Sequence, residues 1–360
     1  MDSQTMLNTY KNRRDALREL VIQAGLEALL VTMDANRFYI SGFELHDSQF
    51  DESSGYVAIL ANGEDWLYTD SRYHEAACEV WDKNRVFIYG GRGPEMVGEH
   101  LKGLLGSKPV GYDARHMSVG DFARFGLDSL VRQDNLVEKL RVIKDASEIA
   151  AMKASCAINE KMMLWLPEQL VPGKTEGEVA WEIEQFFRNH GAEELAFSSI
   201  VAIDERAALP HAIPGAKQIT NNCAVLVDVG CRYKAYCSDQ TRTFWVGDAP
   251  STLFLESLEK VQQAQQKAIE AIAPGKLGKD IYSIARESLA QDGLAEYFTH
   301  GLGHGVGLQT HEAPRFSPLD ETVLEPGMVI TVEPGVYFSG KLGIRWEHMA
   351  LVTETGYEIL

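Results

Sequence analysis

The strongest constraint on the fold is a pattern that occurs twice in the second half of the chain. Each copy contains Pro-Gly-Lys, at residues 172–174 and 274–276, and continues as an amphipathic helical segment that ends at Gly191 or Gly293. A histidine-bearing segment follows, and then an apolar strand that closes on an acid, any residue and a glycine. Although the identity between the copies is low, four features in the same order favour an internal duplication. We therefore expect two halves packed about a pseudo-twofold axis, with their strands converging on one centre.

Two acids lie in or beside the strands of the first copy, where a charge is costly. The segment VDVGCRYKAYCSDQTRTFWVG spans residues 227–247 and contains Asp228 and Asp239 between runs that predict buried strands. If the segment is an antiparallel hairpin that turns near residues 233–234, the two acids face each other directly, with Cβ atoms about 5 Å apart. Ionised carboxylates so placed repel each other, so one of them is protonated, one reaches solvent, or a cation lies between them.

The second copy offers groups of the same kind. Glu333 follows the strand VITV, Glu347 lies in GIRWEHMALV, and His304 and His311 flank a glycine-rich run that allows close approach. Taken singly, each has an ordinary interpretation; Glu347 beside Arg345, for example, is compatible with a surface ion pair. Together, four carboxylates and one histidine suit Mn²⁺, Fe²⁺ or Co²⁺ better than a thiolate-type zinc site. Because four acids exceed the needs of one ion, the set favours two cations about 3.5–4 Å apart.

The first third of the chain alternates helix and strand, which predicts an α/β domain with a mixed sheet. Ligand-like clusters are sparse there, and His46 and Asp47 in a polar loop are expected to be solvated. A charged helical segment, NLVEKLRVIKDASEIAAMKAS, follows as the junction between domains, with Asp145 as N-cap and Glu148 as its capping-box partner. The expected domains are residues 1–133 and 134–360.

The composition excludes several classes of protein. With 52 acidic against 34 basic residues, the formal net charge of −18 argues against nucleic-acid binding and against docking on anionic membranes. No apolar run is long enough to span a bilayer, and the charged N-terminal segment lacks a signal-peptide core. Five cysteines without a CxxC pair predict reduced thiols, so we expect a cytoplasmic protein.

The segments that carry these acids resemble the signatures of the pita-bread metallopeptidase family. They read VDVG, YCSDQTRT, HGLGHGVGLQTHEAPR, TVEPGVY and GIRWEHMALVTETG. The resemblance implies an α+β C-terminal domain with pseudo-twofold halves and a dinuclear metal centre. The family's ligand order of Asp, Asp, His, Glu and Glu falls on Asp228, Asp239, His304, Glu333 and Glu347.

The resemblance implies roles for further residues. The segment ALPHA resembles the family segment whose histidine assists catalysis, and this histidine is His211 here. The alternative is that His211 is a buried, hydrogen-bonded residue of the core. The histidine seven residues after the metal-binding one is His311. Arg315 follows HEAP, where prolidase-like members place an arginine whose planar fork suits the free carboxylate of a dipeptide. A structural role for this arginine is the alternative.

The N-terminal domain narrows the resemblance to one branch. The segment TDSRYHEAA, residues 69–77, resembles the N-terminal domain of creatinase, prolidase and Xaa-Pro aminopeptidase, which methionine aminopeptidases lack. The implied activity is that of an Xaa-Pro dipeptidase, with small peptides that have proline second as substrates. A metal-bridging hydroxide would attack the Xaa-Pro bond, with Asp239 and Glu347 as bridging ligands. Glu333 would carry the proton, and His211 or His311 would stabilise the oxyanion.

Two alternatives stay open. One is an Xaa-Pro aminopeptidase that acts on longer peptides, and the other is a metal-free creatinase-type hydrolase or a non-catalytic binding protein of the same fold. The resemblance also implies a homodimer and two divalent ions per chain, Mn²⁺ first, with Co²⁺, Fe²⁺ and Zn²⁺ as other candidates. The chain departs from the family pattern at Gln240, where an apolar residue is usual, and at His348, where an acid is common. The segment AIDERAALPHA also lacks an upstream glycine.

Overall fold

The computed structural model describes residues 3–44 and 53–360, so His46 and Asp47 lie outside the described residues. The chain divides into two compact units, Met1–Arg141 and Val142–Leu360. Each unit has its own apolar core. Among the described helices, none combines the length and the apolarity that a membrane crossing requires.

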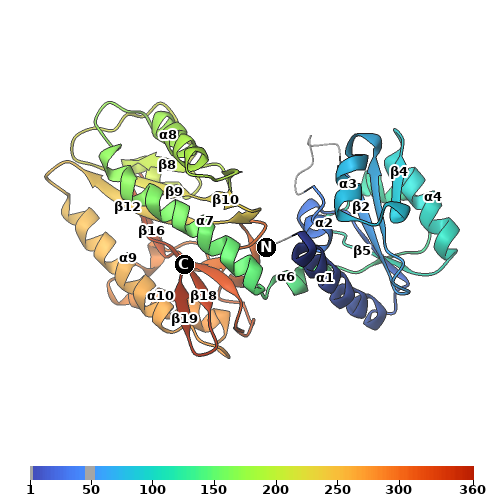
Figure 1. The fold of residues 1–360 in the computed structure, drawn as a ribbon. Helices are drawn as coiled ribbons and strands as arrows, with labels where there is room; N and C mark the ends of the chain where they lie inside the picture. Colours follow the sequence, from blue (N-terminus) through green and yellow to red (C-terminus); the bar gives the residue numbers. More distant parts are fainter. Residues whose placement is uncertain (1–2, 45–52) are drawn as a thin grey trace. The chain divides into compact units, whose positions relative to one another are not determined.

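The N-terminal unit is built on a six-stranded sheet in the order β4-β3-β2-β1-β5-β6 (Figure 1). Strand β2 runs antiparallel to β1 and β3 and the other neighbours are parallel, which confirms the mixed α/β sheet. The strands are β1 (Ala28–Val31), β2 (Tyr56–Leu60), β3 (Trp66–Asp70), β4 (Val86–Tyr89), β5 (Val110–Tyr112) and β6 (Leu130–Arg132). The helices are α1 (Ser3–Gln23), α2 (Asp34–Ser41), α3 (His74–Val80), α4 (Gly93–Leu105), α5 (Val119–Phe125) and α6 (Leu136–Arg141), with 3₁₀ turns η1 (Ser71–Tyr73) and η2 (Lys83–Arg85).

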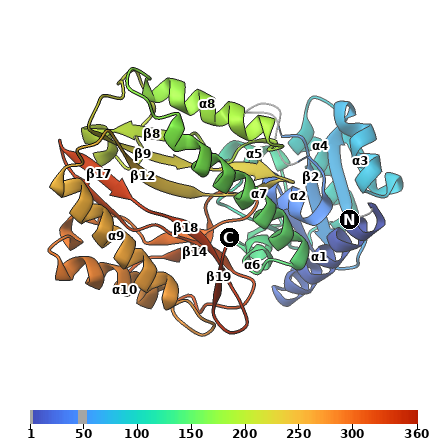
Figure 2. The same ribbon diagram turned by 60° about the vertical axis from the view of Figure 1, so that its left-hand side comes forward.

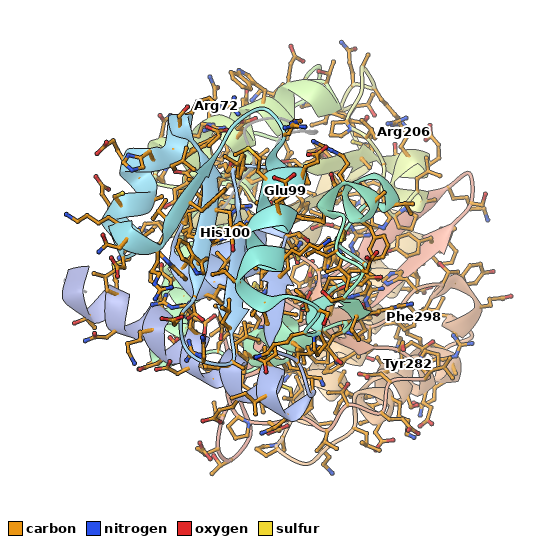
Figure 3. The ribbon with its side chains drawn as sticks, turned by 90° about the vertical axis from the view of Figure 1, so that its right-hand side faces the viewer. Arg72, Glu99, His100, Arg206, Tyr282 and Phe298 are labelled. Atoms are coloured by element: carbon orange, nitrogen blue, oxygen red, sulfur yellow. The ribbon has the colours of Figure 1, made fainter. Side chains whose placement is uncertain are left out.

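A histidine on α4 takes part in the packing of this sheet as an aromatic ring. The ring of His100 lies with its centroid 4.5 Å from that of Phe87 and 4.6 Å from that of Trp66 (Figure 3). The hydroxyl of Tyr68 donates to its Nδ1 over 3.1 Å. Burial lowers the pKa of His100, so the neutral ring is favoured and accepts this hydrogen bond.

The C-terminal unit consists of two halves, each with two helices packed on strands (Figure 2). The first half contains α7 (Ala146–Trp165), η3 (Leu166–Glu168), α8 (Glu176–Asn189), β7 (Glu194–Leu195), β8 (Ile200–Ile203), η4 (Asp204–Ala208), β9 (Cys223–Val229), β10 (Cys231–Tyr233), β11 (Tyr236–Cys237) and β12 (Gln240–Val246). The second contains α9 (Thr252–Glu270), α10 (Gly278–Gln291), η5 (Ala295–Tyr297), β13 (Gly303–Gly305), β14 (Glu312–Phe316), β15 (Val329–Val332), β16 (Gly335–Phe338), β17 (Leu342–Arg345), β18 (His348–Val352) and β19 (Tyr357–Ile359).

The strands form four sheets, and hydrogen bonds join the halves. Their orders are β11-β10-β7, β12-β9-β8, β14-β13-β15-β18-β19 and β16-β17. The N–H of Arg345, at the end of β17, donates to Oγ1 of Thr243 on β12, and the N–H of Glu347 donates to the carbonyl of Thr241 on the same strand. Strand β12 of the first half therefore lies against the β17–β18 segment of the second.

The backbone hydrogen bonds confirm the duplication expected from the sequence. The N–H of Gly173, in the first Pro-Gly-Lys, donates to the carbonyl of Ile219 over 2.9 Å. The N–H of Gly275, in the second, donates to the carbonyl of Leu324 over 2.8 Å. Both glycines have positive φ, 97° and 84°, which glycine adopts without steric cost. One turn thus precedes the second helix of each half, and the acid-bearing strand that follows lies at the same place in both halves.

The charged helical segment expected at the domain junction consists of two helices, α6 and α7. Helix α6 ends at Arg141, and α7 begins after Asp145, whose side chain accepts from the N–H groups of Ser147 and Glu148. The Glu148 side chain accepts from the N–H of Asp145 in return, which confirms the capping box. Between the helices the N–H of Lys144 donates to the carbonyl of Gly327, in the turn before β15, instead of continuing a helical turn.

A network of charged groups lies at the end of β5 in the N-terminal unit. Oε1 of Glu138 accepts from Arg115 Nη2 (2.8 Å), His116 Nε2 (3.1 Å) and Asn36 Nδ2 (3.1 Å). Asp113, His116 and Glu138 have the residue types of a metal site, but Arg115 donates to both acids and occupies their oxygens as a cationic partner. Burial alone would raise the pKa of Glu138, and the hydrogen bonds from His116 and Asn36 with the charge of Arg115 outweigh it, lowering the pKa to about 2. The cluster is therefore an ion-pair network that needs ionised Glu138.

Replacing Glu138 with Gln tests this network. The lowered pKa means that the carboxylate stabilises the fold above about pH 4.5 and that this contribution is lost as the pH falls toward 2. We expect E138Q to lower the free energy of unfolding at pH 7 by about 2 kcal/mol, with the difference from wild type narrowing below pH 4.5. Urea unfolding at several pH values measures it. The exposed pair Glu27–Lys108 supplies the control, since E27Q should have little effect; a pH-independent loss in E138Q would contradict the assignment.

Candidate metal centre

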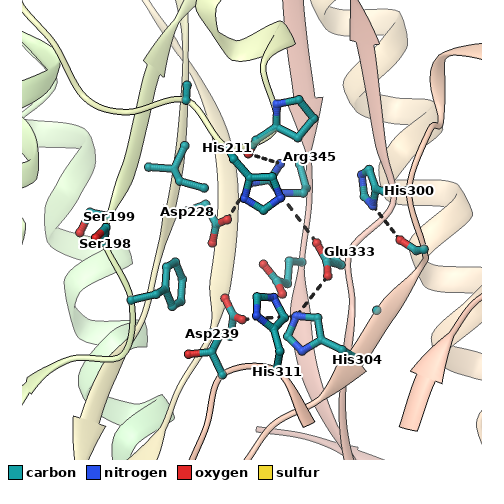
Figure 4. Close-up of a pocket in the computed structure, with 18 of the residues that line it drawn as sticks. Ser198, Ser199, His211, Asp228, Asp239, His300, His304, His311, Glu333 and Arg345 are labelled. Atoms are coloured by element: carbon teal, nitrogen blue, oxygen red, sulfur yellow. Dashed lines mark hydrogen bonds and ion pairs between the residues drawn. The ribbon is translucent and has the colours of Figure 1, made fainter. Parts of the chain in front are cut away.

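The hairpin of the first half brings Asp228 and Asp239 to one face of the sheet. Asp228 is the second-to-last residue of β9 and lies opposite Thr241 of β12. It is therefore not directly opposite Asp239, which the sequence-based prediction had placed there. The two-residue turn consists of Lys234 and Ala235, both with positive φ, one residue later than expected. Moving such a turn by one residue shifts every cross-strand pair by two. Because the shift is even, both carboxylates still point to the same face and into the cavity (Figure 4).

A glycine allows the two acid-bearing strands to approach each other. A Cβ atom on Gly230 would lie 2.0 Å from the carbonyl oxygen of Ser238, the residue before Asp239. Any side chain at this position would push the Asp239 strand away from the Asp228 strand. The glycine of the carboxylate-x-Gly pattern is therefore required by the spacing of the acids.

The second half places its acids and histidine against this pair. Glu333 follows β15, Glu347 lies between β17 and β18, and His304 lies in β13. Oγ1 of Thr241 donates to Oε2 of Glu347 over 2.6 Å, so the residue opposite Asp228 holds an acid of the other half. The acids of the two halves are thus connected by a direct hydrogen bond.

The distances define a compact set of possible metal ligands. Nε2 of His304 lies 3.4 Å from Oε1 of Glu333 and 3.7 Å from Oδ2 of Asp239. Asp239, His304 and Glu347 each offer a ligand atom within 4.8 Å of the others, and all three side chains are buried. Oδ1 of Asp228 is buried and has no hydrogen-bond partner among the described residues. Such an oxygen needs a proton or a cation.

The electrostatics of the site show an excess of negative charge. Burial and the charge of Asp228 raise the pKa of Glu347 to about 8. Burial, with the charges of Glu347 and Asp228, raises the pKa of Asp239 well above its usual value, and burial with Glu347 does the same for Glu333. Burial and the charge of His311 lower the pKa of His304 to about 3, which keeps its imidazole neutral. Buried acids whose pKa values are raised by one another, beside a neutral histidine, fit a site for divalent cations.

Arg345 has a central place that the sequence-based interpretation missed. It is 3% exposed, and its Nη2 donates to Oδ2 of Asp228 over 2.6 Å, so it is not the surface partner of Glu347 that was considered. Its Nη1 donates to the hydroxyl of Tyr337, which donates in turn to Nε2 of His300. Burial and the charge of Arg345 lower the pKa of His300 to about 4, consistent with a neutral acceptor. The signal in the sequence was the spacing of Arg345 and Glu347 in one strand segment, which puts both on one face.

One cavity of about 670 Å³ holds all eight residues proposed from the sequence. Besides the four acids and one histidine described above, these are His211 and His311 (Figure 4), and Arg315. The ring of His311 lies 4.3 Å from that of His304, and burial followed by the charge of Arg315 lowers its pKa. Arg315 is an exposed residue of β14. Apolar side chains complete the wall, among them Phe197, Ile200, Ile213 and Phe316.

Comparison with known proteins gives a consistent result for both units. The metallopeptidase family M24 matches residues 150–354, and the Creatinase/Prolidase N-terminal domain matches residues 13–143. The chain is 35% identical to the Xaa-Pro dipeptidase of Pyrococcus horikoshii over 342 residues, covering 94% of this chain and 93% of that protein.

Solved structures resemble the whole chain. The Xaa-Pro dipeptidase from Bacillus anthracis has a TM-score of 0.90 at 33% identity, with 97% of each chain covered. The X-Pro aminopeptidase from Thermotoga maritima has a TM-score of 0.82 at 33% identity, covering 93% of this chain and 95% of that one. The architecture expected from the sequence, an α/β N-terminal domain followed by a pita-bread domain, is confirmed.

The raised pKa values predict competition between protons and metal ions. Because Glu347 keeps its proton up to about pH 8, and Asp239 and Glu333 have pKa values raised in the same direction, cation binding must release protons. We expect the apparent affinity of the metal-free protein for Mn²⁺ to rise steeply from pH 6 to pH 8 and to level off above pH 8. Calorimetric titration in buffers of different ionisation enthalpy measures affinity and proton release together. An affinity that is flat across this range would contradict the charge balance described here.

Proposed function

This chain belongs to metallopeptidase family M24, and on that premise we propose that it hydrolyses the Xaa-Pro bond of dipeptides in a metal-dependent reaction. The observation that carries the proposal is the convergence of four carboxylates and one neutral histidine, from both halves, in a cavity that also contains Arg315. The relatives with this arrangement of domains include Xaa-Pro dipeptidases. Proline at the second position of a small peptide is the proposed recognition element.

We assign the binding of two divalent cations to Asp228, Asp239, His304, Glu333 and Glu347, with Asp239 and Glu347 as the shared ligands. The raised pKa values of the acids and the partnerless oxygen of Asp228 support the assignment. The oxygen-rich donor set suits Mn²⁺ first, and Co²⁺, Fe²⁺ or Zn²⁺ after it. Bound divalent cations polarise a water molecule and stabilise negative charge that develops on the substrate carbonyl.

The remaining groups suit proton transfer and charge stabilisation. The nitrogen that leaves during hydrolysis is that of proline, and it must gain a proton. Glu333 has a raised pKa and lines the cavity, so it is the proposed carrier of that proton. His211 and His311 line the same cavity and are proposed to donate to the developing oxyanion.

A dipeptidase is preferred to an aminopeptidase that acts on longer peptides, although the similar structures include an X-Pro aminopeptidase. Arg315 is the reason: an exposed guanidinium at the cavity fits the carboxylate that ends a dipeptide. The metal-free alternative, a creatinase-type hydrolase or a binding protein, is disfavoured because the complete ligand set is present in one cavity. We also propose a homodimer in the cytoplasm; the five cysteines without disulfides in the structure fit a reducing compartment.

Replacement of Arg315 with Met tests the carboxylate contact. We expect KM for Xaa-Pro dipeptides to rise about 10- to 100-fold, the effect of losing a charge-assisted pair. Steady-state kinetics on a dipeptide and on its C-terminal amide separate the contact from a structural effect. The wild type should lose affinity for the amide, whereas R315M should treat acid and amide alike. Equal losses on dipeptides and pentapeptides would remove the support for a dipeptidase.

Replacement of Asp239 with Ala tests the metal assignment. Because Asp239 is proposed as a shared ligand, D239A should lose bound metal and hydrolytic activity together, with kcat at least about 10³-fold lower. Metal analysis after exposure to Mn²⁺ and assay of an Xaa-Pro dipeptide measure both. Asp292, a residue at the end of α10, provides the control D292A, which should keep both properties. Retention of wild-type activity in D239A would refute the assignment.

A further inference from the structure

Each half of the C-terminal unit carries a buried carboxamide on its first helix. Asn159 lies on α7 and is 1% exposed, and Gln265 lies on α9 and is 3% exposed. Burial of an amide is costly unless its polar atoms have partners, so the partners of these two side chains indicate what they do. Neither side chain lines the 670 Å³ cavity, and the hydrogen bonds of both go to residues next to the proposed metal ligands.

The amide of Asn159 joins the two acid-bearing strands of the first half. Its Nδ2 donates to the carbonyl of Val229 over 2.9 Å and to Oγ of Ser238 over 3.3 Å. Val229 directly follows Asp228, and Ser238 directly precedes Asp239. One side chain on α7 therefore connects the neighbours of both acids in this half.

The amide of Gln265 does the same in the second half. Its Nε2 donates to the carbonyl of Val332, the residue before Glu333, over 2.9 Å. Its Oε1 lies 3.3 Å, and its Nε2 3.0 Å, from Nδ1 of His348, the residue after Glu347.

The tautomer of His348 decides which of these two contacts is the hydrogen bond. Nη2 of Arg242 lies 2.7 Å from Nε2 of His348, and a guanidinium only donates, so Nε2 is the acceptor. The hydrogen of the neutral ring is then on Nδ1, which donates to Oε1 of Gln265. The amide thus connects the segments that carry Glu333 and Glu347, and His348, a departure from the family pattern, completes the connection.

We propose that Asn159 and Gln265 are a matched pair of positioning residues, each of which holds the two metal-binding acids of its half at the spacing that the cations need. The four acids repel one another, and this repulsion favours separation of the strands that bear them. Each amide opposes that separation from the helix side, by hydrogen bonds to residues next to the acids. The inference rests on the proposed metal ligands, and it is independent of the substrate.

The test is the affinity for Mn²⁺ of protein that a chelator has freed of metal, measured for the variants Gln265→Met and Asn159→Leu. Both substitutions keep the size of the side chain and remove its hydrogen bonds. Mutation of residues that support the metal ligands by hydrogen bonds typically lowers metal affinity 10- to 100-fold. We expect about tenfold weaker Mn²⁺ binding for each variant and a greater loss for the double variant. Gln266→Met is the matched control, since Gln266 is exposed on the same helix and donates only to Glu270. Calorimetric titration gives the affinities without any assay of hydrolysis.

A second control separates positioning from general destabilisation. Lys267→Met removes the contact of Lys267 Nζ with Ser288 Oγ between α9 and α10, which touches no acid-bearing strand. It should lower the melting temperature of the metal-free protein and leave the Mn²⁺ affinity unchanged. If a variant fails to fold, Gln265→Ala and Asn159→Ala remove the amide donors without adding a charge, and the same, about tenfold weaker Mn²⁺ binding is expected for them.

The outcomes are distinct. Wild-type Mn²⁺ affinity in both amide variants would overturn the inference and leave the proposed function intact. Weakened affinity in Lys267→Met equal to that in Gln265→Met would also overturn it, because the effect would then follow stability alone. Absence of Mn²⁺ binding by the wild type would overturn the metal assignment itself, and the inference with it.

Discussion

The repulsion among buried carboxylates is the interaction on which the C-terminal unit depends. Four acids from two halves meet around one histidine, and the buried cation that contacts them is Arg345, bonded to Asp228. One guanidinium does not balance four negative charges, so burial and mutual repulsion raise the pKa values of three of the acids, which favours their protonated forms in the metal-free protein. Replacing these protons by divalent cations satisfies the same oxygens without protonation. The same repulsion among carboxylates therefore governs both metal binding and the stability of the strands that carry these acids.

The duplication explains how one chain forms this cluster of acids: two halves with the same order of turn, helix and strand each contribute two of them. In each half a turn at Pro-Gly-Lys precedes a helix. The helix shares an apolar core with an acid-bearing strand, and a second acid follows on a neighbouring segment. Neither half contains the complete set of ligands. The hydrogen bond from Thr241 to Glu347 shows that the halves meet at the acids themselves. A centre of this kind is complete only when both halves have folded and packed, which couples metal binding to the tertiary structure.

The residues that the sequence predicts best are those with local causes. The capping box at Asp145, the glycines that end α8 and α10, and the order of acids after apolar strands all follow from short-range chemistry. The hairpin register was wrong by two residues because the turn chemistry of Lys234 and Ala235 is uncommon for non-glycine residues. The contacts of Arg345 with Asp228 and Tyr337 could not be predicted, since they join segments that meet only in the folded chain. The burial of amides on helices could not be predicted either, because in the sequence these residues look like polar residues that face solvent.

The choice of an amide at Asn159 and Gln265 has a physical reason. A lysine or arginine at either position would place a further positive charge beside the site and compete with the cations for the acids. An acid would add to the repulsion. An uncharged amide donates to backbone carbonyls and, at Gln265, also accepts from His348, so it fixes the strands and leaves the charge balance to the metal ions. Holding the ligands in place and neutralising them are thus assigned to different groups. In the proposed centre, this division would keep the four acids close together without adding charge to them.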